Sequence, residues 1–93
     1  MLIYKAAYKF LEDGIHAEVL DFPGVITCGK RINETRRLLA GALVDMAETR
    51  LEMGKPLPRP NPEALDSDAD FDEPIHLILK AATQVQVRPA ALA

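Results

Sequence analysis

Two histidines and one cysteine are the side chains of this 93-residue sequence that are most readily placed in catalysis or metal binding. His16 and His76 lie in strand-like segments far apart in the sequence, and neither belongs to a helical His-x-x-x-His pair. Cys28 with either histidine has the residue types of a nucleophile and its base, but no local motif surrounds them. We therefore interpret both histidines as structural and Cys28 as a half-buried thiol. A single cysteine cannot form an internal disulfide, which fits a reducing compartment.

The carboxylates give no clearer catalytic signal. Asp21 follows a predicted strand, where catalytic carboxylates often lie, but we expect its side chain to hydrogen-bond the turn at Pro23-Gly24. A residual nuclease that uses Asp21 and a metal ion is the enzymatic alternative. The alternating aspartates at 66–72 lack the glycine and terminal glutamate of a calcium loop. The sequence therefore predicts a protein that is not an enzyme and has no metal or cofactor.

Charge divides the chain into two candidate partner-binding surfaces. The formal net charge is −3, but residues 63–73 hold six of the 14 acids and no base. Four of the 11 basic residues cluster just before the middle of the chain. We predict partner contacts on both groups, which comprise Lys30, Arg31, Arg36 and Arg37 on one side and Asp66, Asp68, Asp70 and Asp72 on the other. The alternative is that each group is only a solvated surface.

Composition also argues against membranes and nucleic acids as direct partners. No segment approaches the roughly 18 apolar residues of a membrane span, and the first ten residues lack the layout of a signal peptide. We expect a cytoplasmic protein. Tyr4, Tyr8 and Phe10 share one strand face, but no basic residues interleave them as in a base-stacking sheet. Core or interface packing is the better interpretation of these aromatic residues.

Hydrophobic alternation predicts three consecutive antiparallel strands. The first covers residues 2–11, and Glu12-Asp13-Gly14 predicts a hairpin turn because glycine readily adopts a positive φ. The return strand covers residues 15–20. After the turn Asp21-Phe22-Pro23-Gly24, a third strand covers residues 25–28.

A helical pattern follows, from Ile32 or Asn33 to Met53, with Asn33 as its expected N-cap and Gly54 as its stop. The expected core stripe consists of Ile32, Thr35, Leu39, Ala42, Leu43, Met46 and Met53. A second stripe of Ala40, Val44, Ala47 and Leu51 flanks it.

The last third of the chain is harder to interpret. Residues 55–74 form a Pro- and acid-rich linker, 75–80 is ambiguous between strand and helix, and 83–88 alternates as a strand. A right-handed crossover should place this fourth strand parallel to an earlier one, which we expect to be the first. We thus predict a single α+β domain over residues 1–93, with a helix on one face of a mixed four-stranded sheet. The other sheet face should be free for a partner.

The order and spacing of these motifs resemble the HicB antitoxin family over about residues 2–60. The most specific element is the turn Asp21-Phe22-Pro23-Gly24 followed by Thr27-Cys28-Gly29. The hairpin at Gly14, the helix opening at Asn33-Glu34 and the exit Gly54-Lys55-Pro56-Leu57-Pro58 agree with it. We take Asp21, Pro23, Gly24 and Gly29 as the fold-defining turn positions.

The resemblance implies a truncated RNase H-like fold without RNase H catalysis. It implies an antitoxin that occludes a small HicA-type ribonuclease and forms homodimers or larger oligomers. Many members append a DNA-binding module, for which residues 75–93 are too few, so we expect no DNA binding by this chain alone. Lys30-Arg31 stand where the family has an acid and threonine. The alternative function is therefore an orphan HicB-like structural or adaptor protein without a toxin.

Overall fold

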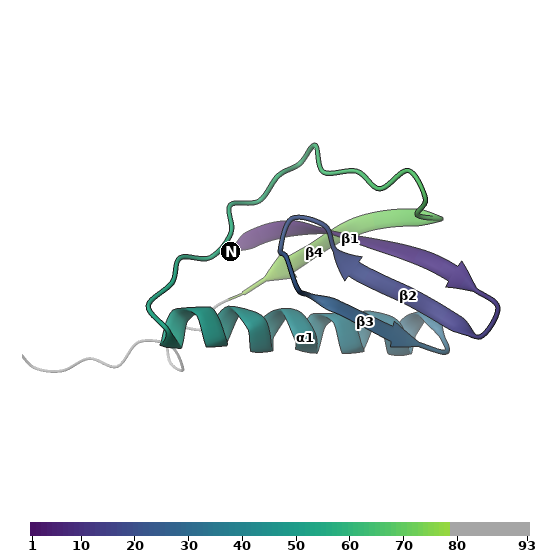
Figure 1. The fold of residues 1–93 in the computed structure, drawn as a ribbon, viewed down its shortest axis with the longest axis horizontal. Coiled ribbons are helices and arrows are strands. Elements are labelled where there is room, and N and C mark those ends of the chain that lie inside the picture. The colour runs from purple at the N-terminus through teal and green to yellow at the C-terminus, as the bar shows by residue number, and fades with distance from the viewer. Residues whose placement is uncertain (79–93) are drawn as a thin grey trace, which may run out of the picture.

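The structure, a computed structural model, describes residues 1–78 and contains one four-stranded sheet with one helix against it (Figure 1). The strand order in the sheet is β3-β2-β1-β4. The elements along the chain are β1 (Leu2–Leu11), β2 (Gly14–Val19), β3 (Ile26–Gly29), α1 (Ile32–Glu52) and β4 (Phe71–Leu77).

The three-strand meander expected from the sequence is confirmed. β1 pairs antiparallel with β2, with Phe10 opposite Ile15, and β2 pairs antiparallel with β3, with Ala17 opposite Thr27. Each boundary agrees with the sequence pattern to within one residue. Gly24 has a φ of 92°, which side chains rarely tolerate, so this position of the β2–β3 turn requires glycine.

The expected parallel orientation of the last strand is wrong. β4 runs antiparallel to β1, with Leu2 opposite Leu77 and Tyr8 opposite Phe71. It also begins at Phe71, inside the predicted linker, and it includes Ile75–Leu77, which the sequence left ambiguous.

The linker explains the reversal. Pro-rich extended chain advances about 3 Å per residue, so the residues between α1 and β4 can travel back along the whole sheet, as Figure 1 shows. A direct crossover would start β4 near the end of α1 and make it parallel to β1. The linker instead carries the chain to the other end of the sheet before β4 begins, so β4 runs antiparallel to β1. The predicted strand at 83–88 lies outside the described residues, and the RNase H-like label stays a prediction.

The core lies between α1 and one face of the sheet. β1 and β2 contribute alternate residues. The helix contributes a stripe of residues that follow one another at intervals of one turn, as the periodicity predicts. The buried apolar residues here include Tyr4, Ala6, Tyr8, Ile15, Ala17, Val19, Phe22, Val25, Leu39, Leu43, Ala47 and Leu77. Met53, which we placed in the stripe, is instead 59% exposed. Ala40, Val44 and Leu51 of the second stripe are exposed, whereas Ala47 is buried.

The helix start differs in detail from the sequence prediction. Arg31, not Asn33, is the N-cap, and its side chain makes no capping hydrogen bond. The buried Thr35 hydroxyl donates to the Arg31 carbonyl at 2.8 Å. A Cβ on Gly29 would lie 3.1 Å from the Thr35 Cα, so glycine there allows β3 and α1 to pack closely.

Candidate partner-binding surface

Residues 55–70, which we call the strap, wrap from the end of α1 to the sheet face opposite the helix. The Tyr4 hydroxyl, on the helix side, donates to the Pro58 carbonyl at 2.7 Å. The Lys5 ammonium donates to the Pro62 and Ala64 carbonyls at 2.8 and 2.9 Å. Because neighbouring residues of β1 point to opposite faces, these bonds hold the strap on both sides of the strand. The second sheet face is therefore partly covered, and not free as we expected.

Asp21 anchors the strap to the meander. Its Oδ1 accepts the Lys5 backbone N–H at 2.9 Å, and its Oδ2 accepts the Asn61 backbone N–H at 2.8 Å. We expected this carboxylate to cap its own turn, and that interpretation is wrong. It instead joins three segments that are distant in sequence. Asp21 also contributes to a raised pKa of Tyr4, although burial of the phenol is the larger cause.

The acidic residues of the strap divide into structural and exposed ones. The Asp70 Oδ2 accepts the Phe10 N–H at 2.6 Å, while the Asp70 N–H donates to the Tyr8 carbonyl at 2.8 Å. The Asp66 Oδ1 accepts the Asp68 N–H at 2.9 Å and closes a local turn. These bonds fix the acidic half of the strap against the end of the sheet.

The other acids of this run leave their carboxylates at the surface. Asp68 is exposed on the strap, and Asp72 is exposed on β4. Leu65, between Glu63 and Asp66, is 76% exposed. The strap thus presents an apolar side chain among negative charges, on a backbone that several hydrogen bonds hold in place.

The predicted basic cluster does not act as one group. Arg36 forms a two-point pair with Glu73 of β4, with Nε–Oε2 at 2.9 Å and Nη2–Oε1 at 3.0 Å. The Tyr8 hydroxyl donates to the same Glu73 Oε2 at 2.7 Å. Hydrogen bonds from Arg36 and then Tyr8 lower the pKa of Glu73 against an opposing effect of desolvation. Burial, followed by the Glu73 contact, raises the pKa of Tyr8. Arg36 therefore has a structural role.

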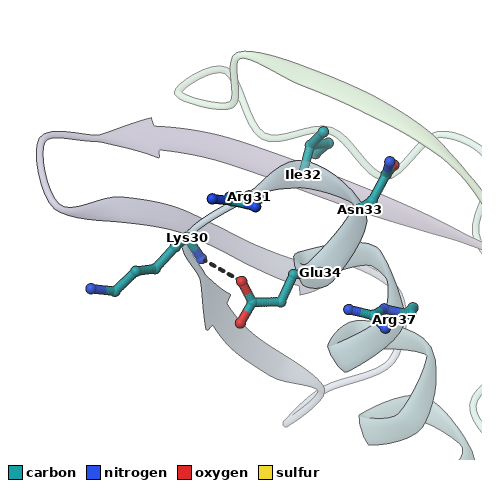
Figure 2. Close-up of a pocket in the computed structure, with 6 residues that line it drawn as sticks. All are labelled: Lys30, Arg31, Ile32, Asn33, Glu34 and Arg37. Carbon is teal, nitrogen blue, oxygen red and sulfur yellow. Dashed lines mark hydrogen bonds between the residues drawn. The ribbon is translucent and has the colours of Figure 1, made fainter.

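The remaining bases surround an open hollow at the start of α1 (Figure 2). The Glu34 Oε2 accepts the Lys30 backbone N–H at 3.3 Å, and the Lys30 side chain extends away from it. Arg31 and Arg37 lie on different sides of the helix start in this view. Since these side chains do not converge, the hollow offers diffuse positive charge and no defined anion site.

The sheet brings together the pair of Cys28 and His16, which the sequence offered without a supporting motif. Cys28 is exposed, and not half-buried as we expected. Cys28 lies directly opposite His16, and its Sγ is 3.8 Å from the His16 Nδ1. The two residues are 12 positions apart in the sequence, so only the β2–β3 register could have revealed the contact. His16 and His76, in contrast, lie opposite Lys9 and Ile3, which are six residues apart on β1.

Residues 1–78 contain neither a metal-binding cluster nor a membrane-spanning helix. Within residues 1–78, no three His, Cys, Asp or Glu side chains gather closely enough to hold a metal ion by themselves. The helix in this part of the chain is not apolar enough to cross a membrane.

Comparisons with known proteins agree with this geometry. The profile of the UPF0150-like family matches residues 2–58. The N-terminal domain of the Burkholderia pseudomallei antitoxin HicB superimposes with a TM-score of 0.67 at 22% identity, covering 84% of this chain and 100% of that one.

Two further structures share the fold. The longer HicB from the same organism gives a TM-score of 0.68 at 22% identity, over 96% of this chain and 70% of that one. A chain of a HicA3 and HicB3 toxin–antitoxin complex gives a TM-score of 0.57 at 21% identity, over 64% of this chain and 71% of that one. No curated protein sequence matches. The resemblance to HicB antitoxins drawn from the sequence motifs is thereby confirmed.

Proposed function

Since the chain belongs to the UPF0150-like family and has the HicB fold, we propose that it is a non-catalytic antitoxin that neutralises a HicA-type ribonuclease by occlusion. One related structure is a HicA3–HicB3 complex, which supports a partner of this class. The observation that carries the proposal is the ordered acidic strap. A ribonuclease must attract RNA phosphates with a basic surface, and the strap has the charge to cover such a surface.

The strap is suited to this role because its backbone is already ordered. Asp21 and Lys5 hold Asn61, Pro62 and Ala64 in place, so binding need not fix a flexible loop at the expense of affinity. Leu65 supplies an exposed apolar contact on the strap, and the exposed carboxylates of Asp68 on the strap and Asp72 on β4 supply negative charge. We assign the toxin contact to these residues and propose that Lys30, Arg31 and Arg37 lie at its margin or outside it.

The experiment is an RNA-cleavage assay with a purified HicA-type ribonuclease from the same genome. We expect one equivalent of this chain to suppress cleavage. Asp68→Asn/Asp72→Asn should weaken binding and reduce the slope of affinity against salt concentration. Asp45→Asn/Glu52→Gln, which removes the same charge from the exposed side of α1, is the matched control and should bind as the wild type does.

Two results would contradict the proposal. If the chain leaves cleavage unchanged at saturating concentration, it is not an antitoxin for this ribonuclease. If the strap and control variants bind equally well, the acidic strap is not the toxin contact even though the protein is an antitoxin.

A further inference from the structure

The pair of His16 and Cys28 has no part in the proposed toxin contact. Both side chains lie on the sheet face opposite α1, because their neighbours Ala17 and Thr27 pair on the helix side. His16 also lies opposite Lys9 of β1. Lys9 is four residues, or about 13 Å, along β1 from Lys5, where the strap crosses the sheet. Asp70 directly precedes β4, so its bonds to Tyr8 and Phe10 lie on the β4 side of β1, away from β2. The hydrogen bonds that hold the strap therefore leave the β2–β3 half of this face open.

The two side chains are spaced for shared coordination of one metal ion. Zinc binds thiolate sulfur at about 2.3 Å and imidazole nitrogen at about 2.05 Å, so a tetrahedral angle separates the two ligand atoms by about 3.6 Å. The observed Sγ–Nδ1 distance is 3.8 Å. The Nδ1 atom already faces the sulfur, and Cys28 is an exposed, free cysteine. One thiolate and one imidazole are also the ligands that favour zinc over the harder cations.

One copy of the described residues supplies only half of a closed zinc site. A structural zinc site takes four protein ligands, and no third His, Cys, Asp or Glu within residues 1–78 joins this pair in a metal-sized group. A two-fold axis through the ion would double the pair to two cysteines and two histidines. Two thiolates also balance the charge of a divalent ion, so the completed site is neutral.

We propose that His16 and Cys28 form a zinc half-site that joins two copies of this chain through the open β2–β3 half of their sheets. On binding, each Cys28 thiol loses its proton to solvent as the sulfur–zinc bond forms, and each His16 Nδ1 binds as a neutral imidazole. Ile26, which is 53% exposed on the same face beside Cys28, then loses contact with water. The proposed antitoxin activity does not depend on this site.

The test is titration of the reduced full chain with Co²⁺, a spectroscopic substitute for zinc. We expect the charge-transfer and d–d absorption of tetrahedral thiolate coordination, with saturation at one ion per two chains and displacement by zinc. Light scattering should show that zinc doubles the particle mass. Cys28→Ser should abolish the absorption and the change in mass, and His16→Ala should do the same.

The exposed His76 on β4 provides the matched control, and His76→Ala should behave as the wild type. Circular dichroism of each variant separates loss of the site from loss of the fold, which we do not expect because Cys28 is a surface residue. Absence of tetrahedral bands would overturn the proposal. Saturation at one ion per chain, or bands that persist in Cys28→Ser, would overturn it as well.

Discussion

Arg36 on α1 and Glu73 on β4 meet through two hydrogen bonds of 2.9 and 3.0 Å. This pair joins the helix to β4, which lies at the opposite edge of the sheet from β3. The guanidinium also lies 6.0 Å from the centre of the Phe71 ring, at the start of the same strand. The Tyr8 hydroxyl completes the group from β1. Three elements are thus linked around one carboxylate.

The lowered pKa of Glu73 predicts an acid-sensitive contribution to stability. The pKa of Glu73 in the folded protein lies below its ordinary value of 4.5. The ionised carboxylate therefore makes its full contribution to stability above pH 4.5, and this contribution is lost as the pH falls through the folded pKa. Glu73→Gln should therefore flatten the fall in unfolding free energy below pH 4.5, as measured by urea titration at a series of pH values. Glu52→Gln, an exposed acid of α1, is the control. If the unfolding free energies of the wild type and Glu73→Gln fall in parallel as the pH is lowered, the Arg36–Glu73 pair does not contribute to the pH dependence of stability.

The two tyrosines predict a transition at the opposite end of the pH range. Burial is the largest cause of the raised pKa of both Tyr4 and Tyr8, whose ordinary value is 10.0. A raised folded pKa means that the neutral phenols stabilise the fold below pH 10 and that this stabilisation is lost as the pH rises above it. Tyrosinate absorbance should therefore appear above pH 10, together with loss of the circular dichroism of the fold. Titration of both phenols at pH 10 in the intact protein would refute this.

Replacement of glycine by alanine should have opposite effects on the unfolding free energy at Gly29 and at Gly41. Gly29→Ala places a Cβ against Thr35 at the contact between β3 and α1, and we expect a loss of about 1–3 kcal/mol in unfolding free energy. Gly41→Ala adds a methyl group to an exposed helix position with open space around it, and we expect a gain of about 1 kcal/mol. Chemical denaturation measures both. If both substitutions changed the unfolding free energy equally, β3 and α1 would not be tightly packed at Gly29.

Asp21 predicts how the strap is held. Asp21→Asn replaces one acceptor oxygen with an N–H₂ group, so only one of the Lys5 and Asn61 amides can keep its bond. Loss of a hydrogen bond to a charged group costs about 1.5–3 kcal/mol. Hydrogen exchange at Asn61 and proteolysis within residues 55–70 should both accelerate, whereas Asp45→Asn should leave both rates unchanged. Unaltered exchange at Asn61 would mean that Asp21 does not anchor the strap.

Local patterns were sufficient to predict the meander and the helix. The alternation in residues 2–11, the Asp13-Gly14 hairpin and the 3.6-residue period around Leu39 and Leu43 each depend on neighbours in sequence. The direction of β4 was not predictable in this way, because it depends on where the linker crosses the sheet. That path is set by Asp21 and Lys5, which bond to residues some 40 to 60 positions away.

The same limit applies to the candidate surfaces. Arg36 has the sequence context of a free surface base, and only the fold places Glu73 beside it. Cys28 and His16 meet only through the β2–β3 register. The acidic character of residues 63–73, in contrast, is a property of composition and was evident from the sequence. What the structure adds is that the backbone under these charges is held in place.

The most direct test of the antitoxin proposal is growth of cells that express a HicA-type ribonuclease from the same genome, with and without this chain. We predict that growth stops with the ribonuclease alone and recovers when the chain is co-expressed, and that the two proteins co-purify. Growth arrest that persists at equal or higher levels of folded chain, with no co-purification, would contradict the account.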